Sequence, residues 1–240
     1  MKAFLLFFCS LICISTFSQN ITGSQLLDNA IKYHDPQNNW NTFNATFTVT
    51  MQTPKNTNRV SNISINLPKE QFYLKTKRDT LISEYTLNKD KCSITLNGKT
   101  DLSDDTLKAN NLSCDRANLY KNYYTYLYGL PMKLKDDGTN IDETIERKTS
   151  KGKEYLVLKV TYDEAVGSDI WYFYFNPKTY AMEIYQFFKT DENGNIKKDS
   201  GEYILLTEEE TINTIKMPKN RAWYYNKDDG YLGTDMLNKQ

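Results

Sequence analysis

The sequence predicts a mainly β protein with a few helices, and three observations support this fold class. Short segments in which apolar and polar side chains alternate run along most of the chain, as in strands that bury one face. Turn signals such as Asn97-Gly98 separate these segments, as in antiparallel hairpins. Aromatic side chains make up 13% of the 240 residues and include 18 Tyr, which argues against intrinsic disorder.

Residues 1–18 have the features of a secretory signal peptide. Lys2 gives a positive start, residues 3–14 are almost entirely apolar, and small residues follow as far as Ser18. We therefore expect cleavage after Ser18, export to the periplasm or the extracellular space, and a single domain over residues 19–240. A retained membrane anchor is the alternative, although the apolar run is short for a bilayer span.

The mature chain is expected to begin with a short helix over residues 25–33. Ser24 can act as its N-cap, and the sequence His34-Asp35-Pro36 should end it because proline disfavours helix in the preceding residue. Five alternating segments then predict a first group of strands, at residues 45–51, 63–67, 72–77, 81–87 and 92–96.

The middle of the chain predicts helices instead. Ser103 marks a helix start, and Ser113 should cap a longer helix over residues 114–128, which Gly129 and Pro131 end. One face of the longer helix is rich in tyrosine and consists of Leu119, Tyr120, Tyr123, Tyr124 and Leu127. Such a helix suits the edge of a groove, and an ordinary helix packed on a sheet is an equally good interpretation.

The second half of the chain predicts six more strands, at residues 155–162, 170–175, 180–188, 203–206, 212–217 and 221–225. The four-residue turn 176–179 should place Phe175 opposite Tyr180, and Trp171 then lies opposite Ile184. One face of this meander is predicted to be apolar and to carry Leu156, Leu158, Val160, Trp171, Phe173, Phe175, Met182 and Ile184. The opposite face then carries Lys159, Thr161, Tyr172, Tyr174, Glu183 and Tyr185.

Cys92 and Cys114 remain after removal of the signal peptide. In an exported protein two cysteines most often pair, so we expect a disulfide between them, with two buried thiols as the alternative. The sequence contains no CxxC motif and a single histidine, which disfavours a zinc site.

Residues suited to catalysis are scarce. His34 is interpreted as a structural residue that caps carbonyls or is solvated, and no GxSxG, P-loop or GxGxxG sequence occurs. The acidic segment 191–195 lacks the spacing of a calcium loop and is read as a turn. The 30 basic and 30 acidic residues balance, so nucleic acid is an unlikely partner on charge. We therefore expect a protein that is not an enzyme and has no metal or cofactor.

Two stretches carry a family resemblance. The sequence WYFYFNPKTYAME at residues 171–183 resembles the strand, turn and strand of LolA/LolB-type lipoprotein carriers, and INTIKMP at 212–218 is similar to a late strand of that family, with Thr214 where Gly is usual. The whole chain, from His34-Asp35-Pro36 and Trp40 through residues 126–131 to 223–225, also resembles a family of exported Bacteroidota proteins known only as a domain of unknown function.

The LolA-like resemblance implies a single antiparallel sheet curled into a half-open barrel, with helices covering the concave face. It also implies a hydrophobic cavity for lipid and no catalysis. The first functional hypothesis is thus a periplasmic binding protein, not an integral membrane protein, that holds a lipid, an acyl chain or a lipidated partner. Its candidate ligand-binding residues are Leu158, Val160, Trp171, Phe173, Phe175, Met182, Ile184, Tyr120, Tyr123, Tyr124 and Leu127.

Two other hypotheses remain. The same apolar face filled by the protein's own helices would be a plain core, and the protein would then be an envelope interaction module that meets a protein partner. A glycan hydrolase that uses two carboxyl groups is the third, and it requires two acidic side chains with perturbed pKa values in one pocket.

Overall fold

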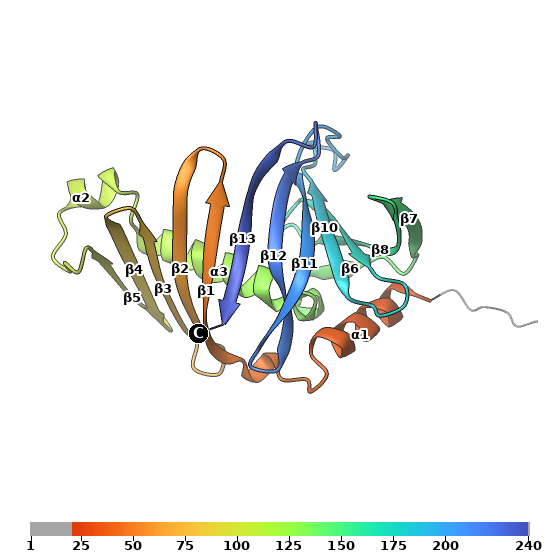
Figure 1. The fold of residues 1–240 in the computed structure, drawn as a ribbon, viewed down its shortest axis with the longest axis horizontal. Helices are drawn as coiled ribbons and strands as arrows, with labels where there is room; N and C mark the ends of the chain where they lie inside the picture. Colours follow the sequence, from red (N-terminus) through yellow and green to blue (C-terminus); the bar gives the residue numbers. More distant parts are fainter. Residues whose placement is uncertain (1–20, 240) are drawn as a thin grey trace, which may run out of the picture.

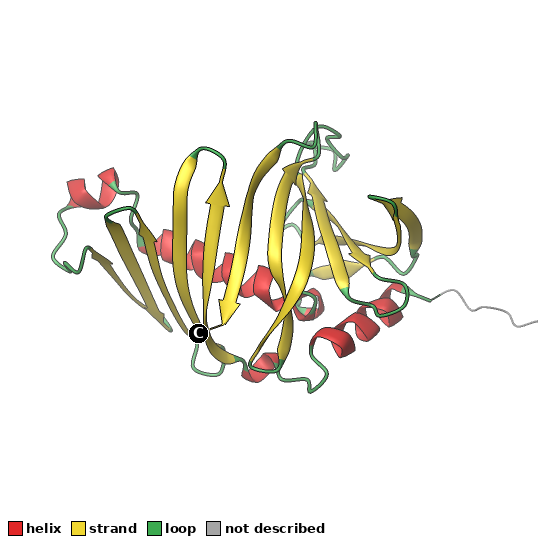
Figure 2. Cartoon of the chain, viewed as in Figure 1, coloured by secondary structure: helices red, strands yellow, loops and turns green. Residues whose placement is uncertain are grey.

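The computed structural model describes residues 21–239, so the predicted signal peptide lies outside the described residues. Thirteen antiparallel strands form one sheet, in the order β5-β4-β3-β2-β1-β13-β12-β11-β10-β9-β8-β6, with β7 also paired to β8. The end strands β5 and β6 do not pair with each other, and the curved sheet stays open (Figure 1; Figure 2). The predicted fold class, a half-open antiparallel barrel with helices on its concave face, is confirmed.

Most strands of the first half lie close to their predicted ranges, but β2 begins seven residues before the predicted segment 63–67. They are β1 (Asn44–Thr53), β2 (Asn56–Asn66), β3 (Gln71–Arg78), β4 (Leu81–Asn88) and β5 (Lys91–Leu96). Each pairs with its neighbour in the sequence, as expected for hairpins. The alternation of β1 appears in its packing, where Phe47 and Val49 are buried.

The second half contains three strands that the sequence pattern did not predict, β6 (Thr139–Ile141), β7 (Glu146–Ser150) and β13 (Tyr231–Lys239). The predicted strands 212–217 and 221–225 are instead one strand, β12 (Ile215–Tyr225), which runs through Pro218. The others are β8 (Lys153–Tyr162), β9 (Ile170–Phe175), β10 (Met182–Phe188) and β11 (Glu202–Ile212). The position of β13 matters most, because it joins β1 to β12 and so connects the two halves of the sheet.

The helices are α1 (Gly23–His34), α2 (Asp104–Ala109) and α3 (Cys114–Gly129), with short 3-10 turns at Trp40–Thr42 and Met132–Lys135. Ser103 and Ser113 cap α2 and α3 as predicted. The N-cap of α1 is Thr22, in a capping box with Gln25, and not Ser24. Ser24 instead donates a hydrogen bond to Glu143.

α3 crosses the concave face of the sheet (Figure 1). Its ring contacts extend from Tyr85 on β4, beside Tyr120, to Trp171 on β9, beside Tyr126. The disulfide Cys92–Cys114 is present and joins β5 to the first residue of α3. Leu119 does not belong to the buried face of the helix, contrary to the prediction, since it is 62% exposed.

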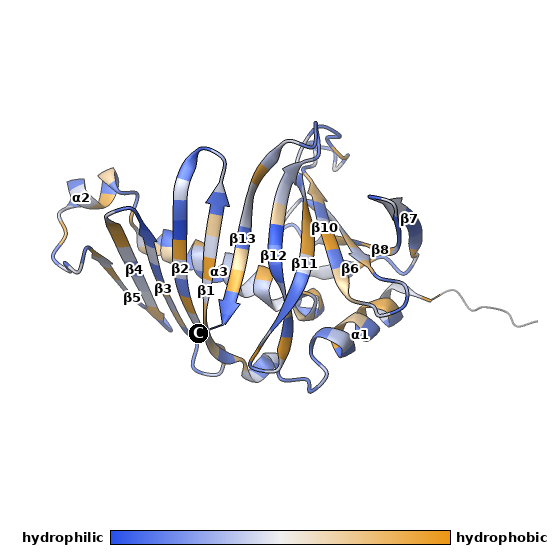
Figure 3. Ribbon diagram, in the orientation of Figure 1, coloured by the Kyte–Doolittle hydropathy of each residue, from blue (hydrophilic) through white to orange (hydrophobic). Residues whose placement is uncertain are grey.

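Orange, apolar segments lie within the sheet where it faces α3, while the outer hairpin turns are blue (Figure 3). α1 closes the lower end of the half-barrel in Figure 1, beside β11 and β12. We call the opposite end the open end. It is formed by the C-terminal ends of β1, β10 and β12 and the N-terminal ends of β9, β11 and β13.

The predicted register between β9 and β10 is wrong. Phe175 pairs with Met182, but Tyr185 then pairs with Phe173, because the register shifts between Met182 and Ile184. This bulge reverses the two faces of the strand after Glu183. Tyr185 is therefore fully buried in the main core, whereas Ile184 packs in a separate cluster on the outer face.

Candidate functional site

Most of the predicted ligand-binding residues on the strands lie in a filled core. Leu158, Val160, Phe173 and Phe175 have no exposed surface, and Met182 is 3% exposed. The prediction that Leu158 shares the apolar face of β9 is correct, since it lies opposite Phe173 and both are fully buried. The centre of the concave face is thus occupied by the protein's own side chains.

The predicted residues of α3 divide into two groups. Tyr124 and Leu127 are buried against the sheet, at 2% and 4% exposure, and Tyr120 packs beside Tyr85 of β4. Tyr123 is 38% exposed and faces the open end of the half-barrel. Space for a ligand beside α3 is left at this end, and another pocket, of about 310 Å³, lies at the opposite end between α3 and the turns at residues 66–71 and 89–90.

An apolar pocket of about 360 Å³ lies between Tyr123 and the strand ends. We call it the rim pocket. It is lined by Met51 and Thr53 of β1, Glu202 of β11, Trp223 of β12, Leu232, Gly233 and Asp235 of β13, and Tyr123. A Cβ atom at Gly233 would lie 2.5 Å from the carbonyl oxygen of Gln52, so this part of the wall has room for glycine alone.

A second pocket of about 340 Å³ lies further along the open end. Tyr126 and Trp171 line it together with Tyr162 and the loop at residues 166–169. Aromatic rings connect the two pockets. Trp171 lies 5.8 Å from Tyr126 and 6.1 Å from Tyr185, and Tyr185 lies 6.1 Å from Trp223, between ring centroids.

A buried polar row lies behind the rim pocket. Arg221 pairs with Asp235, Asp235 with Met51, and Met51 with Arg59, so these four residues of β12, β13, β1 and β2 share one face of the sheet. Arg221 is 1% exposed and Asp235 is 6% exposed. This arrangement places the carboxyl group of Asp235 in the pocket wall and the two guanidinium groups beside it, outside the lining.

The terminal nitrogens of the two arginines donate to partners other than Asp235. Arg221 donates from Nη1 to the carbonyl of Pro218 at 2.8 Å, and its guanidinium lies 3.9 Å above the ring centroid of Tyr128. Nη2 of Arg59 donates to the hydroxyl of Tyr124 at 3.5 Å. Neither arginine forms an ion pair with Asp235 in the described part of the chain.

Unsatisfied polar atoms gather in this region. Of the seven buried side-chain atoms in residues 21–239 that lack a hydrogen-bond partner, five belong to Arg59, Tyr128, Tyr185, Arg221 and Asp235. Buried polar atoms without a partner are rare, so each of them calls for an explanation. Burial raises the pKa of the Asp235 carboxyl, and the charges of Arg221 and Arg59 oppose this shift.

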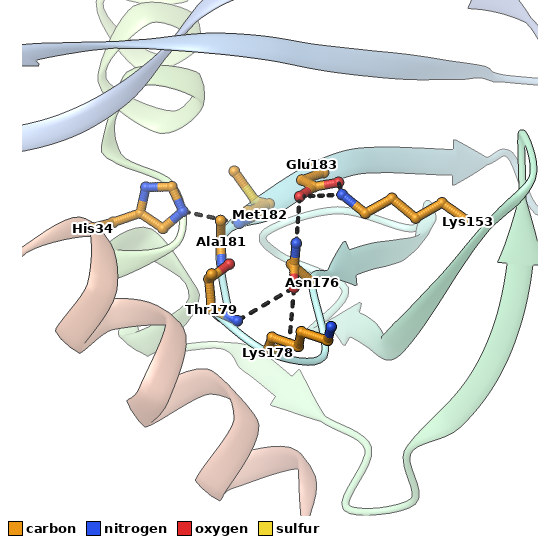
Figure 4. Close-up of polar contacts among 8 residues, drawn as sticks. All are labelled: His34, Lys153, Asn176, Lys178, Thr179, Ala181, Met182 and Glu183. Atoms are coloured by element: carbon orange, nitrogen blue, oxygen red, sulfur yellow. Dashed lines mark hydrogen bonds and ion pairs between the residues drawn. The ribbon is translucent and has the colours of Figure 1, made fainter.

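His34 is buried at the closed end of the half-barrel, where both of its ring nitrogens are hydrogen-bonded. The sequence interpretation had it bind carbonyl groups at the helix end or lie in solvent. Its Nδ1 lies 2.7 Å from the carbonyl oxygen of Lys216. Its Nε2 accepts from the backbone N–H of Met182 at 2.9 Å (Figure 4). These partners fix the neutral ring, with the proton on Nδ1. Burial lowers the pKa of His34, which agrees with that state and with a structural role.

Figure 4 also shows the turn between β9 and β10. Oδ1 of Asn176 accepts from the backbone N–H groups of Lys178 and Thr179, at 2.9 and 3.3 Å. Nδ2 of Asn176 donates to the carboxylate of Glu183. The same carboxylate accepts a hydrogen bond from Nζ of Lys153 at 2.7 Å. Glu183 is the residue skipped by the register shift, so these contacts hold the bulge that turns Tyr185 inward.

Sequence reasoning missed Arg59, Arg221, Trp223 and Asp235 as members of the site. Asp235 was not recognised as a site residue because β13 was not predicted. The alternation of Gly233, Asp235 and Leu237 with Thr234 and Met236 was the signal that could have indicated this strand. The predicted turn at residues 191–195 is correct, since Asp191 accepts from the N–H groups of Asn193 and Asn195. Within the described residues, no group of three or more His, Cys, Asp or Glu side chains could hold a metal ion.

Comparisons with known proteins place the chain in a family. Among solved structures it is similar to a LolA superfamily protein from Nitrosomonas europaea, at 9% identity and a TM-score of 0.49 over 92% of this chain and 93% of that one. It is also similar to a DUF1329 family protein from Desulfovibrio piger, at 7% identity and a TM-score of 0.49 over 91% and 92% of the two chains. No curated protein matches the chain. A family model described as "Family of unknown function (DUF6503)" matches residues 1–239, and the chain belongs to that family.

Proposed function

We propose that the protein is an exported, non-catalytic binding protein that holds the apolar chain of a lipid or a lipidated partner at its open end. The observation that carries this proposal is the rim pocket. Its volume of about 360 Å³ is within the usual range for small-molecule sites, and its walls combine Met51, Tyr123 and Trp223 with few polar atoms.

The rim pocket lies at the open end of the half-barrel, where the alkyl chain of a ligand can enter from solvent. Each buried CH₂ contributes about 0.8 kcal/mol, so a single alkyl chain that fills the pocket supplies several kcal/mol of binding free energy. The filled core beneath α3 then acts as the floor of the site and not as the site itself. In this proposal Leu158, Phe173 and Phe175 no longer contact the ligand. Tyr123 and Trp171 keep the role first expected of them, and Trp223 is added.

The filled core also favours a second candidate, an envelope interaction module that binds a protein and no small ligand. Leu158, Val160 and Phe173 have no exposed surface, which is the feature expected of that alternative. The two candidates differ at the rim pocket. A lipid-binding protein must fill it with ligand, whereas an interaction module has no such requirement.

The geometry disfavours the glycan hydrolase. Glu202 and Asp235 both line the rim pocket, but they lie two strands apart and four residues out of register. At about 3.3 Å per residue and 4.8 Å per strand, their Cα atoms are about 16 Å apart. Glycosidase carboxyl groups lie within about 5 to 9.5 Å of each other, so these two are poorly placed to flank one bond.

The test introduces a charge into the rim pocket. The full precursor is expressed so that it is exported, and the purified protein is weighed by native mass spectrometry before and after organic extraction. Tyr123→Glu places a carboxylate against the apolar wall and should remove an extractable lipid adduct. Leu119→Glu is the matched control, because it adds the same charge one turn away on an exposed position of α3.

An adduct in the wild type and in Leu119→Glu, but not in Tyr123→Glu, supports the proposal. An adduct retained by both variants would show that the lipid lies elsewhere. A wild-type protein that carries no lipid and takes up none from detergent-solubilised lipid would contradict the proposal and favour the interaction module.

A further inference from the structure

The five arginines of the chain fall into two groups. Arg147 lies on the edge strand β7 and forms an ion pair with Glu154. Among residues 21–239, no ion pair involves the other four, which are Arg59, Arg78, Arg116 and Arg221. A guanidinium group stays charged at every ordinary pH, so burying one without an anion is costly. The arginines that lie inside the half-barrel therefore call for an explanation.

Two of these arginines lie opposite each other on neighbouring strands. The pairing of β2 with β3 extends to Val60 and Lys77, and Arg59 and Arg78 are the next residues of the two strands. Both alternate in the same phase as the residues buried under α3, so both side chains belong to the concave face. Like charges directly opposite each other on a sheet are destabilising.

Both guanidinium groups keep a buried donor without an acceptor. In Arg59 and in Arg78, Nε is buried and has no hydrogen-bond partner within residues 21–239. Nη2 of Arg59 donates to the hydroxyl of Tyr124 at the long distance of 3.5 Å. Asp79 follows Arg78 in the chain, but it accepts from the hydroxyl of Thr57 at 3.0 Å. The two neighbouring arginines thus have donors for an anion that the described part of the chain does not supply.

The row of inward-facing residues at the open end has an excess of positive charge. From β12 to β3 the row consists of Arg221, Asp235, Met51, Arg59 and Arg78. Asp235 is the direct neighbour of Arg221, and it is two strands from Arg59 and three from Arg78. At 4.8 Å per strand, the last two separations are about 10 and 14 Å between Cα atoms. Even with Asp235 ionised, the row retains two positive charges, and they lie at Arg59 and Arg78.

This arginine pair adjoins the rim pocket. Met51, which lines the pocket, is the strand partner of Arg59. Tyr123, on the other wall, directly precedes Tyr124, whose hydroxyl Arg59 contacts. The polar end of a chain that lies in the pocket can therefore reach the two guanidinium groups across β1.

We propose that Arg59 and Arg78 bind the anionic head group, a carboxylate or a phosphate, of the amphiphile whose apolar chain lies in the rim pocket. This inference rests on the proposed function, because it names the polar end of the same ligand. Arginine presents its donors in a planar fork that matches the oxygens of both groups. An anion between the two side chains supplies the missing acceptors and removes their mutual repulsion.

The experiment compares decyl phosphate, decanol and inorganic phosphate by isothermal titration calorimetry at pH 7.5, with the decyl compounds kept below their critical micelle concentrations. The two decyl compounds share the chain, and the two phosphates share the anion. We expect decyl phosphate to bind about tenfold more tightly than decanol, the effect of one charge-assisted hydrogen bond. It should also bind more tightly than inorganic phosphate, which lacks the chain. Raising the salt concentration should narrow the difference between decyl phosphate and decanol.

Arg78→Met is the principal variant, because it removes the charge and keeps an unbranched side chain. It should lower the affinity for decyl phosphate about tenfold and leave decanol binding unchanged. Arg59→Met is the second variant, with the same expected result, and thermal unfolding checks that both variants fold. Arg147→Met is the matched control, since it makes the same substitution at an exposed arginine of the edge strand β7.

The outcomes separate this inference from the proposed function. A preference for decyl phosphate over decanol that is lost in Arg78→Met or Arg59→Met and kept in Arg147→Met supports the inference. Equal binding of the two decyl compounds, or a phosphate preference that survives both substitutions, overturns the inference and leaves the proposed function standing. Inorganic phosphate that binds as tightly as decyl phosphate would assign the arginine pair to a free anion and also overturn the inference. Failure of both decyl compounds to bind overturns both claims.

Discussion

At the scale of single residues, the buried polar side chains of this protein serve two different purposes. His34 is satisfied on both ring nitrogens and joins the end of α1 to the starts of β10 and β12. Asp235 is equally buried but keeps an unpaired oxygen beside an apolar pocket. A satisfied buried group holds the fold together, whereas an unsatisfied one at a pocket indicates a place for a ligand.

His34 makes stability depend on pH. Because burial lowers its pKa below 6.5, the unfolded chain binds the proton more readily than the folded chain. The contribution of His34 is therefore complete above pH 6.5 and is lost as the pH falls from 6.5 through the pKa of the folded state. The slope of this loss is at most about 1.4 kcal/mol per pH unit.

Urea unfolding of the wild type and of His34→Gln at pH 7.5 and pH 5.5 measures this effect. His34→Gln should be less stable than the wild type at pH 7.5, and the gap should narrow at pH 5.5. All other titrating groups are common to the two proteins and cancel in the difference. Equal gaps at the two pH values would show that His34 does not lose its neutral state on acidification.

At the scale of elements, the disulfide Cys92–Cys114 fixes the start of α3 to the sheet edge. It closes a segment with a sequence separation of 22 residues that contains α2. In the chain-entropy model such a loop stabilises the folded state by about 3 kcal/mol. Replacing both cysteines by serine should lower the free energy of unfolding in urea by about this amount. Unchanged stability would mean that the contacts of α3 with β4 and β5 hold the segment without the bond.

Local patterns predicted most elements of the fold because each hairpin carries its own alternation and turn signals. Strands β1, β3, β4 and β5 and helix α3 lie where the sequence indicates, and the disulfide forms as expected. The register of β10 was not predictable from a turn length, since the contacts of Glu183 with Asn176 and Lys153 hold a bulge there. The face on which Tyr185 lies depends on that bulge.

The site was less predictable than the fold because it is assembled from distant strands. Asp235, Arg221 and Arg59 become neighbours through the pairing of β13 with β1 and β12. No local sequence pattern indicates that β13 pairs with β1 and β12. The apolar residues Leu158 and Phe173 had the right character for a cavity, but only the packing of α3 shows that the protein fills this space itself.

At the scale of the whole molecule, the half-barrel has one closed end and one open end. α1 and His34 close part of the lower end, α3 fills the centre, and the two pockets of the open end lie where Trp223 and Trp171 meet Tyr123 and Tyr126. Within residues 21–239, no helix is both long enough and apolar enough to span a bilayer. The central claim is that ligand binding occurs at the open end and not in the core.

The three tryptophans of the sequence provide the most direct test of this claim. Trp223 and Trp171 line the two pockets, while Trp40 is 6% exposed and packs against Phe43 and Gly129 away from both pockets. The measurement is a two-dimensional NMR spectrum of the indole N–H groups of ¹⁵N-labelled protein during titration with decyl phosphate, with each signal assigned by a Trp→Phe variant. We predict that the Trp223 signal shifts with saturation while the Trp40 signal stays in place. A shift of Trp40 without Trp223, or no shift of any signal at saturating ligand, would contradict a binding site at the open end.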